Sequence, residues 1–176
     1  DSTFGVVNFE GVEAISTPYE FEILLVSTNK MIDLGEVLQY PVVFAIHRGG
    51  EDDVLYNGIL AEFVQLHEYN EYVYYKARLM PRFWWLTLTT HNQVFLDKTA
   101  QEIIDLALKD GGLTGLDYEF QLHGKYDPVD YVCQYDESHF DFISRWCERE
   151  GIYYYFAQSW QGEKIIFTDT RITNPA

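Results

Sequence analysis

Histidine and cysteine are the side chains best suited to carry protons, attack substrates or bind metals, and this chain has few of them. Its five histidines are scattered, with no two of them three or four residues apart: His47, His67, His91, His123 and His139. A zinc-binding helix needs that spacing. The chain also lacks a phosphate loop, a dinucleotide fingerprint and a nucleophile elbow. The sequence therefore predicts no catalytic residue, no cofactor-binding residue and no metal ligand.

Carboxylates are plentiful, with 28 Asp and Glu against 12 Lys and Arg and a net charge of -16. Two carboxylates that meet in space could act as acid and base in a glycan hydrolase, although so many acids also form close pairs by chance. The run Glu51-Asp52-Asp53 lacks the ligand spacing of a calcium loop and indicates a solvated turn. The acidic balance excludes nucleic acid as a partner, because phosphate recognition needs positive charge.

Aromatic side chains make up 17% of the residues, and three of them stand together as Phe83-Trp84-Trp85. Exposed Trp84 and Trp85 rings could stack on sugars, as they do in carbohydrate-binding β modules. No polar residue interrupts the three rings, which favours a core or interdomain plug instead. A carbohydrate-binding module stays open as the alternative function, ahead of a carboxylate-based glycan hydrolase.

Two cysteines are too few for a zinc site or a disulfide framework, although a bridge between Cys133 and Cys147 stays open. Asp141 and Arg145 are spaced for an ion pair on one helix face, a contact worth about 0.2–0.5 kcal/mol. Asp141 also stands where a carboxylate meets the free N–H groups of a helix start. These structural roles are favoured over a catalytic base and an anion clamp.

The first half of the chain reads as β-structure. Five runs rich in Val, Ile, Tyr and Phe predict strands at Phe4–Phe9, Phe21–Val26, Val42–Ile46, Val54–Leu66 and Tyr72–Met80. In the last of them Lys76 and Arg78 share one face, and Tyr75, Ala77 and Leu79 share the other. The connections are too short for helical crossovers, so we expect residues 1–90 to form an antiparallel barrel-like subdomain.

The second half, residues 91–176, is predicted to be a smaller α+β subdomain. Thr99 and Glu102 form a capping box for one helix, which Gly111-Gly112 ends. A second helix is expected between Ser138 and Gly151. Strands are predicted before this helix and at Asp117–Leu122, Ile152–Phe156 and Lys164–Thr168. The fold class is thus mainly β with α+β insertions.

Neither a membrane helix nor a signal peptide is expected. No stretch approaches the ~20 apolar residues of a membrane span. The chain opens Asp1-Ser2-Thr3, without a basic and apolar leader.

Several motifs, in a fixed order, resemble the VgrG family of type VI secretion spike proteins, which is similar to the phage tail baseplate hub. The strongest is the block Tyr131–Phe156, with its Gln134-Tyr-Asp-Glu-Ser138 and Glu150-Gly151-Ile152 segments. The others are Phe9–Glu22, Tyr56-Asn57-Gly58-Ile59, Met80–Leu86, Asn92–Phe95 and Thr99–Ile104. Together they span almost the whole chain.

The resemblance implies a structural part of a contractile injection apparatus rather than an enzyme. It implies a homotrimeric hub that docks on a hexameric, Hcp-like tail-tube protein and carries a puncturing needle. Effectors or a needle tip would attach through regions outside this chain, which would be part of a longer hub–spike protein. Assembly in the bacterial cytoplasm and export by the secretion apparatus are expected, with no cofactor.

Overall fold

The computed structural model describes residues 3–38 and 40–170. Their contacts divide the chain into two compact units. The first contains Pro18–Arg82, Gln158–Glu163 and the described residues before position 15, and the second contains Ile15–Thr17, Phe83–Ala157 and the described residues from Lys164 onward. The division into two domains at residue 90 stays a prediction.

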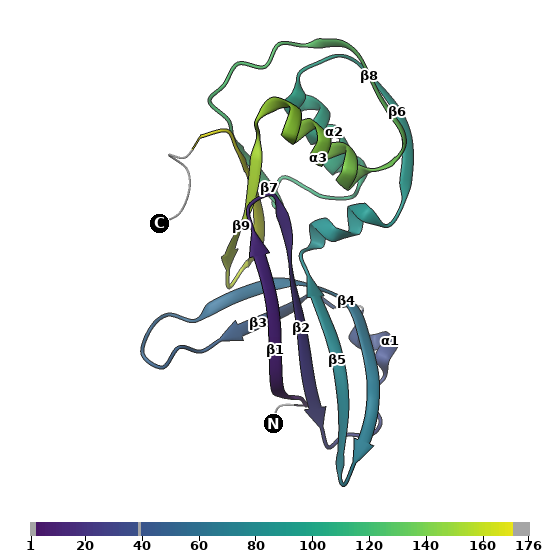
Figure 1. The fold of residues 1–176 in the computed structure, drawn as a ribbon, viewed down its shortest axis with the longest axis vertical. Helices are drawn as coiled ribbons and strands as arrows, with labels where there is room; N and C mark the ends of the chain where they lie inside the picture. Colours follow the sequence, from purple (N-terminus) through teal and green to yellow (C-terminus); the bar gives the residue numbers. More distant parts are fainter. Residues whose placement is uncertain (1–2, 39, 171–176) are drawn as a thin grey trace. The chain divides into compact units, whose positions relative to one another are not determined.

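The first unit is built on one five-stranded sheet in the order β1-β2-β5-β4-β3, which curls into a half-barrel (Figure 1). Its elements are β1 (Gly5–Ala14), β2 (Thr17–Ser27), α1 (Leu34–Val37), β3 (Val42–Ile46), β4 (Val54–Tyr69) and β5 (Tyr72–Met80). The pairings β2–β5, β5–β4 and β4–β3 are antiparallel. Register shifts at Leu60/Glu62 and Gln65/His67 mark irregularities in β4, which bend a strand. The predicted all-β first half is confirmed.

Strand β5 has one packed face and one wetted face, as its sequence predicts. Tyr75, Ala77 and Leu79 are fully buried in the core of this unit. Lys76 and Arg78 point the other way, where both lie within ion-pair distance of Glu62 on β4.

The second unit combines short sheets with two helices. Its elements are η1 (Arg82–Thr87), β6 (Thr90–Lys98), α2 (Ala100–Asp110), β7 (Tyr118–Gln121), β8 (Val129–Ser138), α3 (His139–Glu150), β9 (Tyr153–Ser159) and β10 (Gly162–Thr168). Strands β6 and β8 form a two-stranded antiparallel sheet, and β7-β10-β9 form a second sheet in which β7 and β10 run parallel. Figure 1 shows α2 and α3 side by side within the curve of β6 and β8.

Local sequence signals place both helices. The Thr99 hydroxyl accepts from the Glu102 N–H, and the Glu102 carboxylate accepts in return from the Thr99 N–H, so the capping box is present. Ser138 caps α3 through the Asp141 N–H, and Gly151 ends it at a φ of 69°. That left-handed conformation favours glycine. Both predicted helices are confirmed.

The core of the second unit lies beneath these helices. Its largest fully buried side chains are Phe83, Ile103, Ile104, Leu108, Phe142, Ile143, Trp146, Tyr154 and Phe167. Phe83, the first ring of the aromatic triplet, is wholly buried and packs edge-on against Tyr154.

Candidate functional site

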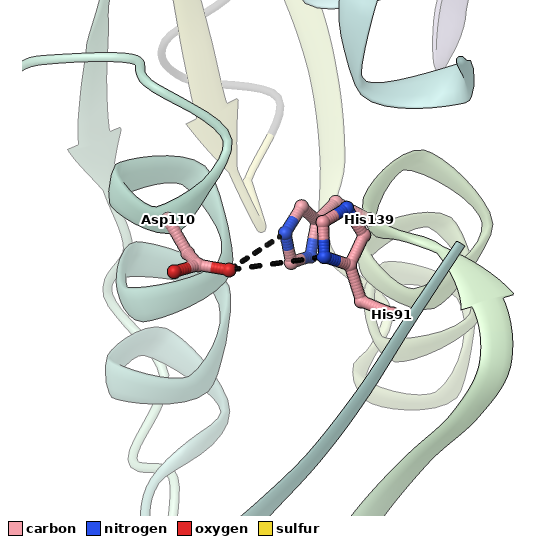
Figure 2. Close-up of side chains that lie close together, drawn as sticks. All are labelled: His91, Asp110 and His139. Carbon is pink, nitrogen blue, oxygen red and sulfur yellow. Dashed lines mark hydrogen bonds and ion pairs between the residues drawn. The ribbon is translucent and has the colours of Figure 1, made fainter. Parts of the chain in front are cut away.

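The structure brings together two histidines and a carboxylate that lie far apart in the sequence: His91, Asp110 and His139 (Figure 2). His91 is the second residue of β6, Asp110 is the last residue of α2 and His139 is the first residue of α3. Among the residues that the structure describes, they are the one group of three or more His, Cys, Asp or Glu side chains close enough to share an ion.

Strand pairing explains why the two histidines meet. The register of β6 and β8 places Thr90 opposite Ser138, so the residues that follow each, His91 and His139, lie at the same end of this ribbon. Their rings stack with centroids 3.7 Å apart and planes 17° apart. Asp110 Oδ2 lies 3.0 Å from His139 Nε2 and 4.0 Å from His91 Nδ1.

Neighbouring polar groups fix the orientation of each member of the cluster. The Thr89 hydroxyl lies 2.8 Å from His91 Nε2, and Gln93 Nε2 donates to Asp110 Oδ2 at 2.5 Å. Gln134 Nε2 lies 3.3 Å from His139 Nδ1 and also donates to the Glu137 carbonyl, while Gln134 Oε1 is buried without a hydrogen-bond partner. The cluster is therefore held by side chains from β6, from β8 and from the residue before β6.

Burial lowers the pKa of His139 and so favours its neutral form. Its side chain is 1% exposed, and the loss of hydration lowers its pKa, as does the neighbouring His91 ring. The Asp110 carboxylate opposes this shift without cancelling it. A neutral imidazole can act as a metal ligand, and so can the other two side chains.

The aromatic triplet separates into three environments. Phe83 is the buried plug that the sequence favours, Trp84 is half-buried and Trp85 is 44% exposed. All three lie in η1, a 3₁₀-helix, where consecutive side chains point about 120° apart. Trp84 and Trp85 therefore leave the helix in different directions, which disfavours a shared platform for sugar stacking.

The predicted pair between Asp141 and Arg145 is wrong. Arg145 reaches back to Glu137 instead, with Nη2 at 2.5 Å from Oε1, and its guanidinium lies over the Phe142 ring. Asp141 accepts from the Ser138 hydroxyl at 2.6 Å at the start of α3. The Arg145 guanidinium donates from both Nε and Nη2 to the Glu137 carboxylate. Two such hydrogen bonds outweigh the weak ion pair that Asp141 would offer along the helix.

The two cysteines are both free thiols, so the bridge left open by the sequence does not form. Cys133 is exposed on β8, whereas Cys147 is buried in α3. Burial raises the pKa of the Cys147 thiol to about 12.

The Tyr56-Asn57-Gly58 motif in β4 connects this strand to the segment Gln158–Glu163 of the first unit. The N–H and Nδ2 groups of Asn57 both donate to Gln158 Oε1 at 3.0 Å. The Tyr19 hydroxyl contacts the Asn57 carbonyl and the Glu163 carboxylate. Gly58 is needed because a Cβ at this position would lie 2.2 Å from the Met80 carbonyl oxygen. These motif residues pair buried polar groups and permit close packing, so their role is structural.

Comparison with known proteins identifies the family. Residues 12–175 match the phage tail baseplate hub (GPD) family, and the chain belongs to it. Among relatives, the type VI secretion system spike protein VgrG5 of Pseudomonas aeruginosa is 34% identical over 98% of this chain and 22% of its own length. VgrG1a of the same organism is 32% identical over 91% of this chain and 25% of its own length. The resemblance to the VgrG family is confirmed, and the chain spans about a quarter or less of these relatives.

Solved structures agree. An Escherichia coli protein, c3393, has a TM-score of 0.92 and 28% identity, and it covers 98% of this chain and 48% of its own. It is described as a component of the type VI secretion system with structural similarity to the T4 tail proteins gp27 and gp5. A chain of a Francisella PdpA–VgrG complex has the same fold, with a TM-score of 0.64, 12% identity and coverage of 96% of this chain and 26% of its own.

These matches define the chain as a structural, hub-like protein of the type VI spike and phage tail class. The prediction that it is not an enzyme follows from this family, whose role is structural. No helix among the described residues is long and apolar enough to cross a membrane.

Proposed function

We propose that the chain is the N-terminal hub part of a homotrimeric type VI secretion spike, which docks on a hexameric, Hcp-like tail tube and carries the puncturing needle. The observation that carries the proposal is the TM-score of 0.92, over 98% of the chain, with a secretion-system component. Effectors or the needle tip join through regions outside this chain. Assembly takes place in the bacterial cytoplasm, and the spike leaves through the secretion apparatus.

An apolar surface on the second unit supports assembly. We call it the ribbon face: Val94 and Leu96 on β6 and Tyr131 and Tyr135 on β8, all exposed. Leu96 pairs directly with Tyr131 in the register. The alternate residues Phe95 and Val132 are buried on the opposite side. Exposed apolar side chains that gather on one face can mark an interaction site, so we assign the ribbon face to contacts between copies of the chain.

Mass measurement in solution tests the trimer. The full-length protein that contains this chain should have the mass of three subunits by light scattering coupled to gel filtration. Leu96→Lys should shift the population toward the monomer, because it places a charge in the ribbon face. Leu116→Lys is the matched control, since Leu116 is exposed in the turn before β7 and belongs to neither strand of the ribbon face, and it should leave the trimer intact.

The outcomes separate the two parts of the proposal. A wild-type monomer at every concentration would contradict the trimer. A trimer that Leu96→Lys and Leu116→Lys leave equally intact would retain the assembly but contradict the assignment of the ribbon face.

Co-sedimentation tests docking on the tube. When full-length protein is mixed with purified tube protein, the two should pellet together. Without tube protein, the full-length protein should remain in the supernatant. An absence of association at low and at high salt would contradict the docking step, because an acidic chain with a net charge of -16 is sensitive to ionic strength.

A further inference from the structure

The geometry points to a binding site for a divalent transition metal ion, such as Zn²⁺, formed by His91, Asp110 and His139. This metal site is independent of the assembly proposed above. The sequence gives no sign of it, because the three residues are at least 19 positions apart, and only the fold brings them together.

The spacing of the three ligand atoms suits a tetrahedral ion. Zinc bonds of about 2.0–2.1 Å to nitrogen or oxygen place neighbouring ligand atoms about 3.3 Å apart. Asp110 Oδ2 lies 3.0 Å from His139 Nε2 and 4.0 Å from His91 Nδ1, and all three atoms lie within 4.8 Å of one another. The two imidazole rings stack with their planes 17° apart, so one ring must swing out of the stack before both nitrogens face the same ion.

Thr89 offers a partner for the His91 nitrogen that would not bind the metal. The Thr89 hydroxyl lies 2.8 Å from Nε2 of His91 and can accept the proton of that nitrogen. In this tautomer Nδ1 carries a lone pair, which faces the anionic Asp110 carboxylate across 4.0 Å. A cation between Nδ1 and the carboxylate would select this tautomer over the one in which Nδ1–H points toward Asp110. A metal-bound histidine typically donates its other N–H to such a fixed oxygen.

His139 must move one proton to bind the ion. Without metal, its Nε2–H donates to Asp110 and its Nδ1 accepts from Gln134. A metal at Nε2 shifts the proton to Nδ1. The Gln134 amide can then rotate by 180°, so that its unpaired Oε1 accepts this proton and its contact with the Glu137 carbonyl is lost. Gln134 is thus a positioning residue for the ring.

The ligand set and its exposure favour Zn²⁺, Co²⁺ or Ni²⁺. Two imidazoles and one carboxylate are ligands that these borderline ions accept, whereas Ca²⁺ and Mg²⁺ prefer oxygen alone. The Asp110 side chain is 50% exposed, so water can fill a fourth position. The bound ion would fasten the end of α2 to the start of α3 and to β6. We assign it a bracing role, in keeping with the structural family.

Titration with metal alone tests the site. The full chain, without a histidine tag and treated with a chelator, is titrated with Zn²⁺ against a coloured competitor. It should bind one equivalent, and Co²⁺ should give the visible absorption of a tetrahedral complex. His91→Ala and Asp110→Asn should each weaken binding about tenfold or more. These positions are chosen because His139 is buried and its replacement would disturb packing.

Two other histidines provide matched controls. His47 and His123 are exposed and each lies beside a single carboxylate, that of Asp53 or Asp169. His47→Ala and His123→Ala should leave the affinity for Zn²⁺ unchanged. The site is refuted if folded wild-type protein binds no Zn²⁺, or if His91→Ala and Asp110→Asn bind it as tightly as the two controls.

Discussion

Replacing Trp146 by alanine should strongly destabilise the second unit. The indole is 1% exposed in α3, beside Phe142 and beneath the Arg149 guanidinium, which lies 4.8 Å from the ring centroid. Loss of a buried tryptophan and the cavity that it leaves cost about 3–5 kcal/mol, and the cation–π contact adds about 0.5–1 kcal/mol.

The indole N–H of Trp146 makes the expected loss of stability smaller. Trp146 Nε1 is buried without a hydrogen-bond partner, and removing such a group returns about 1–3 kcal/mol. The net loss of unfolding free energy should therefore be about 3 kcal/mol. Trp146→Phe removes the same N–H but keeps much of the ring, so its loss should be smaller than that of alanine.

Urea unfolding followed by far-ultraviolet circular dichroism measures these differences without relying on tryptophan fluorescence. Trp160→Ala is the matched control, because Trp160 is 68% exposed at the turn between β9 and β10, and its effect should stay within about 0.5 kcal/mol. An unfolding midpoint of Trp146→Ala equal to that of the wild type would refute the packing argument for α3.

Three further predictions can be checked with the same protein. Gly58→Ala should cost about 1–3 kcal/mol in urea unfolding, because its Cβ would meet a carbonyl of β5, whereas Gly115→Ala, which has open space, should be neutral. A thiol reagent at pH 8 should label Cys133 quickly and Cys147 only after unfolding, and two equally fast thiols would contradict the burial of the second. In chelator, the free energy of unfolding should fall as the pH drops through about 6.5, since the pKa of His139 is lowered in the folded protein and the unfolded chain takes up the proton first. His139→Gln should flatten this pH dependence, and an unchanged profile would contradict it.

Local chemistry made much of the fold predictable. The strands Val42–Ile46 and Tyr72–Met80 have the predicted bounds, because β-branched and aromatic runs end there at turns. The helices follow from caps such as Thr99 and Gly151, whose effect depends only on adjacent backbone. Features that depend only on residues close together in the chain can be predicted from the sequence.

Long-range pairing was not predictable in this way. The sequence does not reveal β6 as a separate element, because its partner β8 follows about 40 residues later. The parallel pairing of β10 with β7 likewise leaves no local trace. The cluster of His91, Asp110 and His139 depends on the register of β6 and β8, so its members could not be joined from spacing alone. The contact of Arg145 with Glu137 is shorter in range, but helix spacing does not predict it, since Glu137 precedes the helix.

The hydrogen bonds that join Tyr19 and Asn57 to Gln158 and Glu163 have a consequence for protein synthesis. Gln158 and Glu163 belong to the first unit, although most of the chain between them and Arg82 belongs to the second. Tyr19 and Glu163 are 144 positions apart. At about 5–20 residues per second, a ribosome adds that stretch in on the order of 10 s. During this interval the curled sheet has left the ribosome without the Gln158 partner of Asn57 and the Glu163 partner of Tyr19, and these contacts form only after nearly the whole chain has been made.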